Sequence, residues 1–227
     1  MRDHDPTQPL IFIHVPKTAG ISVREIFSAW YGDRLYPHYF NPANQQMPPH
    51  VDLEAQTQAG NPPLIYGHFN RLRGFGVPDY YPQVRQFLAI LRDPLDMHLS
   101  RYFFIRRKQA TNHSIHSDLG DASAEAHVRD NHLNMLEHFP RPVTFDNYKD
   151  IIEEYFIDIG LFEDLPRTLT RFATKLGKDT ALVDGLQHRN ATPRSGSIPI
   201  DLQDQFREKW KLEYEVYSYV REMQSAL

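Results

Sequence analysis

The chain contains short apolar runs that predict buried strands, and longer amphipathic stretches that predict helices. The apolar runs are rich in β-branched and aromatic residues, which is typical of a parallel sheet covered on both faces. They occupy residues 10–15, 63–67, 86–91 and 156–161. Apolar residues at helical spacing predict helices over residues 22–31, 95–108, 124–139, 145–155, 165–176 and 201–223. Because strands and helices alternate without an internal repeat, we expect one α/β domain over residues 1–227, with three layers around a central, mostly parallel sheet.

Polar stretches without clear periodicity separate these elements. Residues 37–63 are rich in Pro, Asn and Gln and predict a long excursion over the surface. Residues 109–124 predict a flexible linker or lid, and residues 187–199 predict an irregular, charged loop. Since long loops often bind ligands, we expect the first two stretches to shape a binding pocket.

Length and composition limit the class of protein. With 227 residues, 41% of them hydrophobic, the chain is long enough for one sizeable core. The formal net charge of −4 provides no basic field for nucleic-acid binding, so an anionic ligand must be held by a local site. The absence of cysteine excludes disulfides and thiolate metal sites. No apolar run could span a membrane and residues 1–9 are polar, so we expect a soluble, cytoplasmic protein.

The first predicted strand leads through a small polar loop into a helix. Residues 16–22 (PKTAGIS) lie where the N–H groups and the positive dipole end of a helix attract anions. Lys17 supplies charge, Ala19 and Gly20 allow close approach of the backbone, and Ser22 can cap the helix. For any one of these residues an ordinary helix start is the simpler interpretation. Their joint order after a strand indicates a phosphate site.

A second unit of the same kind follows the third predicted strand. Arg92 stands at the strand end, and Ser100 lies about two turns into the following helix. The planar guanidinium of arginine makes paired, charge-assisted bonds to phosphate oxygens. Taken separately, the two residues are an ordinary surface arginine and an ordinary helix serine. Together with the first loop they predict two phosphate sites at one edge of the sheet.

Both segments resemble the nucleotide-binding motifs of sulfotransferases that use 3′-phosphoadenosine 5′-phosphosulfate (PAPS), in particular the branch of carbohydrate and glycosaminoglycan O-sulfotransferases. The resemblance implies a P-loop-like sulfotransferase fold, a 3′-phosphate site at Arg92 and Ser100, adenosine 3′,5′-bisphosphate (PAP) as product, and no metal. The residues implied for the 5′-phosphosulfate loop are Lys17, Thr18, Ala19, Gly20, Ile21 and Ser22. That branch usually has threonine at the position of Ile21, so the isoleucine here removes one possible hydroxyl contact. The same branch often has arginine at the position of Met97. In this chain either the contact of that arginine is lost, or a residue such as Arg101 makes it instead.

His68 is the candidate general base. It follows a predicted strand in the segment YGHF, at the sheet edge where α/β sites form, and histidine has a pKa suited to proton transfer near neutrality. The family carries its catalytic histidine in a similar Gly-His segment. A histidine that only caps the strand is the alternative. We expect His14 to be a satisfied core residue of the first strand. His127 and His132 are five apart, which does not suit two metal ligands on one helix face.

Other segments extend the resemblance over most of the chain. Residues 159–164 and 189–194 look like family segments. The family tends to close the loop before the last helix over the nucleotide, and the residues implied there are Arg189, Asn190 and Arg194. An exposed, solvated loop is the alternative.

The sequence therefore predicts sulfuryl transfer from PAPS to an acceptor hydroxyl, with Lys17 and His68 as catalytic residues. We expect the acceptor to be a carbohydrate or another small molecule, and neither its identity nor the oligomeric state can be deduced. An ATP-dependent phosphotransferase is an alternative, disfavoured because its loop needs the lysine after the last glycine, whereas Lys17 precedes Gly20. A non-catalytic nucleotide-binding module is the second alternative to a sulfotransferase. Because the carbohydrate branch often carries a membrane anchor, a trimmed Golgi-type enzyme acting in the Golgi lumen is a second expectation for localisation.

Overall fold

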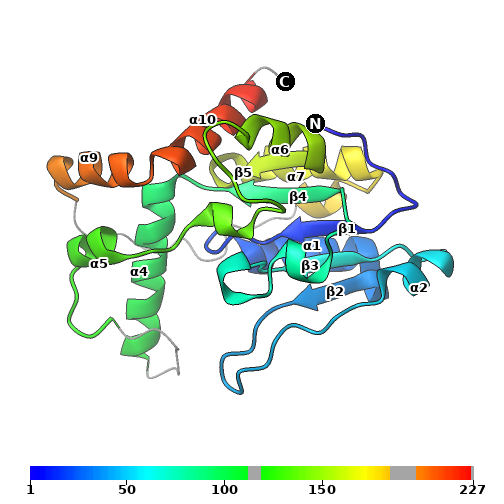
Figure 1. Ribbon diagram of the computed structural model, residues 1–227, viewed down its shortest axis with the longest axis horizontal. Helices are drawn as coiled ribbons and strands as arrows, with labels where there is room; N and C mark the ends of the chain where they lie inside the picture. Colours follow the sequence, from blue (N-terminus) through cyan, green and yellow to red (C-terminus); the bar gives the residue numbers. More distant parts are fainter. Residues whose placement is uncertain (112–118, 185–197, 226–227) are drawn as a thin grey trace.

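The structure is a computed structural model, and it describes residues 1–111, 119–184 and 198–225. Within these ranges five strands form one sheet, in the order β2-β3-β1-β4-β5 with every neighbouring pair parallel (Figure 1). The strands are β1 (Leu10–Ile13), β2 (Leu35–His38), β3 (Leu64–Gly67), β4 (Phe87–Leu91) and β5 (Phe156–Leu161). The predicted α/β class with a central parallel sheet is confirmed.

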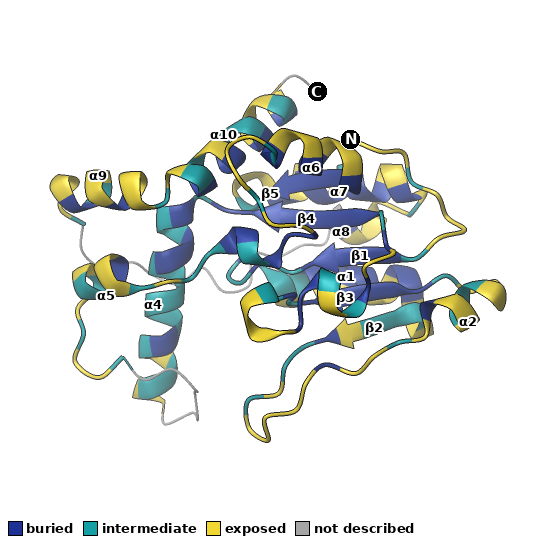
Figure 2. Cartoon of the chain, in the orientation of Figure 1, coloured by how far each residue is buried: buried dark blue, intermediate teal, exposed yellow. Residues whose placement is uncertain are grey.

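Helices cover both faces of the sheet and complete the three layers. Side chains alternate along β1, so that Leu10 and Phe12 pack on one face and Ile11 and Ile13 on the other. The first face is covered by α1 (Gly20–Tyr31), α7 (Leu165–Leu176) and the short α8 (Ala181–Asp184), and the second by α6 (Tyr148–Tyr155) and α10 (Lys211–Ser225). Every residue of β1, β3, β4 and β5 is buried (Figure 2), which explains their continuous apolar sequences.

The other helical segments connect and flank these layers. The long helix α4 (Pro94–Ala110) follows β4, and α5 (Ala124–Asp130) and α9 (Ile200–Lys209) pack beside it. The shorter segments are α2 (Leu53–Gln58), α3 (Val77–Tyr80), and the 3-10 turns η1 (Gly32–Arg34), η2 (Arg71–Arg73), η3 (Met135–His138) and η4 (Phe162–Asp164). None of the described helices combines the length and apolarity that a membrane span requires.

The expected surface excursion over residues 37–63 is wrong at its start, where the chain forms β2. This strand lies at the edge of the sheet and contains Pro37. Proline is tolerated there because one side of an edge strand has no partner. The proline and the partly exposed neighbours explain why the pattern gave no strand signal.

Two expected helices are also corrected. The helix expected over 124–139 ends at Asp130, because Asn131 is extended and its side chain accepts a hydrogen bond from the Leu133 N–H. The helix expected over 201–223 is two helices, α9 and α10, separated at Trp210. The Trp210 ring packs 5.3 Å from that of His98, on α4, which bends the chain around that helix. Both breaks come from contacts that the local pattern does not encode.

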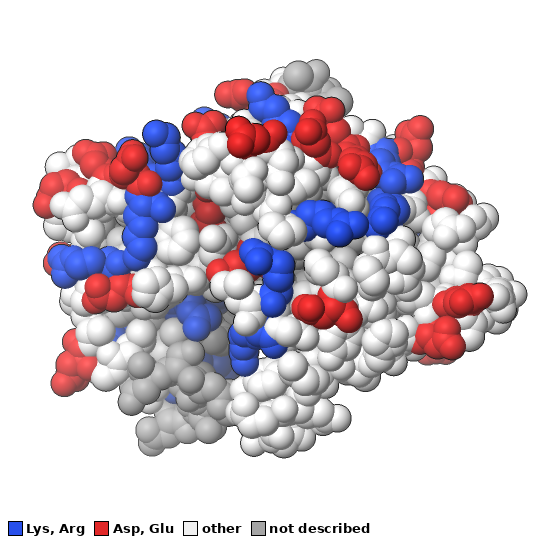
Figure 3. Space-filling model, viewed as in Figure 1, with Lys and Arg blue, Asp and Glu red and all other residues white. Residues whose placement is uncertain are grey.

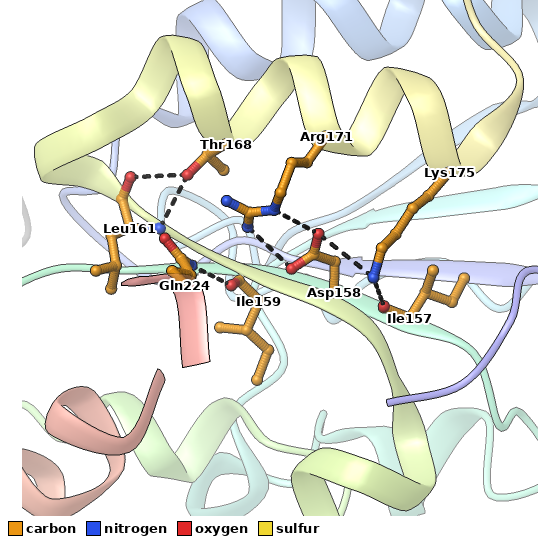
Figure 4. A network of polar contacts seen from close by, with 8 residues as sticks. All are labelled: Ile157, Asp158, Ile159, Leu161, Thr168, Arg171, Lys175 and Gln224. Carbon is orange, nitrogen blue, oxygen red and sulfur yellow. Dashed lines mark hydrogen bonds and ion pairs between the residues drawn. The ribbon is translucent and has the colours of Figure 1, made fainter. Parts of the chain in front are cut away.

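A buried polar network fastens α7 to β5 (Figure 4). The carboxylate of Asp158, which is fully buried, accepts two hydrogen bonds of 3.0 Å from the guanidinium of Arg171. The ammonium of Lys175 lies 3.7 Å from the same carboxylate and donates to the Ile157 carbonyl at 2.8 Å. Such a paired charge is stable in the interior only while its partners remain, so this network holds the edge of the sheet in one register.

The strand order places three loops at one edge of the sheet. Parallel strands β3, β1 and β4 are neighbours, so the segments that follow them begin side by side, at residues 68, 14 and 92. The arrowheads of β1 and β2 point toward α4 (Figure 1). After β1 the chain continues to β2 and β3 on one side, and β4 and β5 lie on the other. Ligands of open α/β sheets bind at such a switch of strand order.

Candidate functional site

The loop between β1 and α1 has a backbone suited to an anion. Lys17 and Ala19 both adopt left-handed conformations, with φ angles of 69° and 61°. Non-glycine residues rarely do so, and residues of alternating hand turn backbone N–H groups toward one concave side. The Thr18 hydroxyl is buried and donates to the Val15 carbonyl at 2.8 Å. Thr18 therefore braces the loop, and its hydroxyl proton points into the protein instead of toward a ligand.

Helix α1 begins earlier than the sequence indicates. Its N-cap residue is Ala19, which has no polar side-chain atom, and Gly20 is its first residue. Of the two expectations for Ser22, that it caps or that it opens the helix, the first is wrong, because Ser22 lies inside the first turn. The N–H groups of Gly20, Ile21 and Ser22 have no partner within their own helix, and they lie at the positive end of a 12-residue dipole. The side chain of Ile21 is 63% exposed and offers no hydrogen-bonding atom.

Positive charges converge on this loop. The Lys17 ammonium lies 3.9 Å from the centre of the Phe104 ring, on α4. Burial, followed by the charges of Arg92, Arg107 and Arg101, lowers the pKa of Lys17 to about 8. Figure 3 shows Lys and Arg atoms in the hollow between α4 and the strand ends. Four cations held this close destabilise one another, which is the arrangement expected of a site that receives a multiply charged anion.

Arg92 connects the two predicted phosphate loops. Its side chain is buried, donates from Nη1 to the Lys17 carbonyl at 3.0 Å, and stacks 4.2 Å from the centre of the Phe162 ring. The segment is fixed further by the Asp93 N–H, which donates to Glu163 at 2.9 Å. Residues 162 and 163 belong to the third segment that resembled the family, and the structure places them against the second loop.

The remaining candidates that follow the second loop lie on helix α4. Ser100 is half-buried and lies about two turns into α4, as the sequence pattern predicts. Met97 is fully buried in the core. Arg101, one turn beyond Met97, is half-buried, and its charge lowers the pKa values of both Lys17 and His68. That Arg101 replaces the arginine contact missing at Met97 stays a prediction.

His68 lies at the carboxyl edge of the sheet, directly after β3, as expected. Its Nδ1 is 2.6 Å from the His14 carbonyl oxygen. A carbonyl only accepts, so Nδ1 carries the proton and Nε2 carries the lone pair. Within the described ranges, no hydrogen bond occupies Nε2. Burial, and then the charge of Arg101, lowers the pKa of His68 to about 4. His68 is therefore a neutral imidazole with its basic nitrogen available at pH 7.

His14 is not a core residue of the first strand, and this expectation is wrong. β1 ends at Ile13, and the half-buried His14 ring stacks on that of His68 at 4.4 Å between centroids. Its Nδ1 is 2.9 Å from the Tyr39 hydroxyl. The ring of His138, on η3, lies 5.9 Å from that of His68 on another side. The alternation of Leu10, Phe12 and His14 indicates that the three side chains share one face of the sheet. Only the end of β1 at Ile13 shows that His14 lies in the following loop, beside His68.

Arg189, Asn190 and Arg194, the residues implied for the closing loop, lie outside the described residues. Among residues 1–111, 119–184 and 198–225, no group of three His, Asp or Glu side chains is arranged to hold a metal ion. The described candidates therefore form two groups, one of the first loop with Arg92 and Arg101, and one of imidazole rings beside it.

No protein-family model matches the chain, and no curated protein matches it in sequence. It is similar to a crystal structure of mouse sulfotransferase SULT7A1 complexed with PAP, with a TM-score of 0.48 and 14% identity over 80% of this chain and 64% of that one. It is also similar to a retinol dehydratase in complex with androsterone and inactive cofactor PAP, with a TM-score of 0.38 and 14% identity over 80% and 63%. The chain spans less than two thirds of either protein.

Proposed function

We propose that the chain is a sulfotransferase that transfers a sulfuryl group from PAPS to an acceptor hydroxyl. The observation that carries the proposal is the convergence of Lys17, Arg92 and Arg101 on the start of α1, beside the neutral His68. The three cations at the helix start suit a phosphate anion, and the neutral His68 suits proton removal from a neutral acceptor. The sequence motifs of both loops support the same function.

The nucleotide is assigned across the two loops. Residues 17–22 would hold the 5′ end through backbone N–H groups and Lys17, and the 3′-phosphate would lie at Arg92 and Ser100. Because Arg92 already donates to the Lys17 carbonyl, binding at one loop fixes the geometry of the other. Arg101 adds charge between the first loop and His68.

PAPS supplies an activated sulfuryl group. In the transfer a bond forms between the acceptor oxygen and sulfur, and the bond from sulfur to the 5′-phosphate oxygen breaks, with its electron pair left on that oxygen. His68 Nε2 takes the acceptor proton, while the Nδ1 proton stays on its bond to the His14 carbonyl. Lys17 stabilises the charge that grows on the departing phosphate oxygen. Most of the rate enhancement would come from positioning and electrostatics, as in phosphoryl transfer.

The direct test compares sulfate transfer from labelled PAPS with phosphate transfer from labelled ATP, over a panel of sugars, phenols, lipids and peptides. We expect transfer from PAPS to a hydroxyl acceptor, a carbohydrate or small molecule, and none from ATP. His68→Ala should abolish the transfer while His4→Ala, a change at the opposite edge of the sheet near Leu10, should not. Transfer from ATP alone would establish the phosphotransferase alternative. Binding of PAP without transfer to any acceptor would establish a binding module.

A further inference from the structure

His14 lies between the two halves of the site and has no role in the reaction as described above. Its ring stacks on His68, the proposed base, at 4.4 Å and 23°. On its other side is the start of α1, where a β-carbon built on Gly20 would lie 1.8 Å from His14 Nε2. Glycine is therefore required at position 20 because the imidazole of His14 touches the first residue of the helix.

Tyr39 determines which nitrogen of His14 carries the proton. The Tyr39 hydroxyl lies 2.9 Å from His14 Nδ1, and burial raises the pKa of this phenol, so it keeps its proton. Among the described residues, His14 Nδ1 is the one acceptor within hydrogen-bond distance of that hydroxyl. A largely buried phenol donates where an acceptor is present. We assign the hydroxyl as the donor to Nδ1, which puts the proton of the neutral ring on Nε2.

The ring of His14 is held neutral. Burial, followed by electrostatic interactions with His68, His138, Arg24 and Lys17, lowers its pKa well below the ordinary value. A neutral imidazole with Nδ1 engaged by Tyr39 is a fixed N–H donor at Nε2. In the described part of the chain, no hydrogen bond of the protein uses this donor, and the face of the ring at Nε2 lies against Gly20, the N-terminal residue of α1.

We propose that His14 is a further catalytic residue, whose Nε2–H donates a hydrogen bond to the sulfuryl group during its transfer. The inference rests on the proposed function. If the 5′ end of the nucleotide lies at the start of α1 and the acceptor lies at His68, the group in transit passes the one imidazole that touches both. A neutral donor fixed in advance stabilises charge on the sulfuryl oxygens and needs no reorganisation when the bond breaks.

Three variants test this role. His14→Phe keeps the stacking on His68 and the contact with Gly20 but removes both nitrogens. His14→Gln places an amide N–H near the position of Nε2, and Tyr39→Phe removes the hydroxyl that fixes the tautomer. We expect kcat of His14→Phe to fall by about 10²-fold, the usual effect of losing one preorganised donor, and His14→Gln to recover at least a tenth of wild-type kcat. Tyr39→Phe should fall between wild type and His14→Phe.

PAP binding, measured by calorimetry, separates a contact with the sulfuryl group from damage to the site. PAP lacks that group, so His14→Phe should bind PAP within about threefold of wild type. His14→Phe with kcat within twofold of wild type would overturn the inference. So would His14→Gln with as little activity as His14→Phe while both bind PAP, because the ring would then act through packing alone. Failure of the proposed function differs from both, since the wild type itself would not transfer sulfate, whether or not it binds PAP.

Discussion

Lys17→Met should stabilise the ligand-free chain while it removes the proposed activity. Methionine matches the length and flexibility of lysine, keeps contact with the Phe104 ring, and bears the same left-handed φ of 69° without added strain. The substitution therefore changes little except the charge. Since Lys17 is an anion-binding residue in our account, its charge is held in the ligand-free site at an energetic cost.

The size of the effect follows from the pKa of Lys17, which falls from 10.5 to about 8. One pKa unit corresponds to about 1.4 kcal/mol, so the buried charge costs up to about 3 kcal/mol at pH 7. Loss of the cation–π contact with Phe104 offsets about 1 kcal/mol of this. We expect the free energy of unfolding of Lys17→Met to exceed that of wild type by about 2 kcal/mol.

The difference should depend on pH in one direction. Below pH 8 Lys17 is charged in both states, and the full cost is present. Between pH 8 and 10.5 the folded protein has lost the proton that the unfolded chain still binds, so wild type gains stability relative to the variant as the pH rises. The advantage of Lys17→Met should therefore shrink by about 2 kcal/mol between pH 7 and pH 9.5.

Urea unfolding of both proteins at pH 7 and pH 9.5, with and without PAP, measures the difference in the free energy of unfolding and its dependence on pH and on PAP. PAP at 100 times its Kd should stabilise wild type by about 2.7 kcal/mol and should not stabilise the variant. Lys149→Met, an exposed position on α6, is the matched control and should behave as wild type. The reasoning is refuted if Lys17→Met is less stable than wild type at pH 7, if its advantage does not change with pH, or if PAP stabilises it fully.

Three further predictions address other parts of the structure. Because the pKa of His68 is about 4, the acidic limb of the kcat/KM profile should lie near pH 4, and a limb near pH 6.5 would argue against His68 as the base. Ala19→Gly should leave the free energy of unfolding within about 1 kcal/mol of wild type because glycine suits the left-handed backbone. Gly20→Ala should lower the free energy of unfolding by about 1–3 kcal/mol and should also weaken PAP binding. Equal effects of the two substitutions would contradict the contact between Gly20 and His14. Asp158→Asn should lower the free energy of unfolding by about 3–5 kcal/mol in denaturant titrations and leave PAP affinity unchanged, and a loss below about 1 kcal/mol would show that its ion pairs contribute little.

The sequence patterns predicted four of the five strands of the described sheet because those segments are buried on both faces. β1, β3, β4 and β5 are apolar at every position or nearly so, which no surface segment imitates. β2 is half-exposed and contains a proline, so its strand character comes from pairing with β3, which is distant in sequence. Short-range patterns contain no information about that pairing.

The positions of the candidate residues in the fold were predicted where a local motif encodes them. Lys17, Arg92 and His68 each follow a strand, and the parallel sheet brings the three strand ends together. His14 and Arg101 were missed or left open for a different reason. Their contacts come from Tyr39, Gly20 and the packing of α4, which depend on the folded arrangement of segments far apart in sequence.

The inward hydroxyl of Thr18 shows a second limit of motif reading. A motif position identifies the residue at the site but not the direction of its side chain. Thr18 donates to Val15 and closes the loop, so the groups of the segment left to bind the proposed nucleotide are its backbone N–H groups and the Lys17 ammonium. Which atoms a motif supplies is determined by hydrogen bonds that form only in the folded loop.

The measurement that tests the central claim most directly is the affinity of the wild-type chain for PAP and for 5′-AMP, determined by calorimetry at pH 7. The two ligands differ by the 3′-phosphate, which is assigned to Arg92 and Ser100. We predict that PAP binds at least about 100-fold more tightly than 5′-AMP, since charge-assisted bonds to a phosphate contribute about 1.5–3 kcal/mol each. Equal affinities, or no binding of PAP, would contradict the assignment of this site to PAPS.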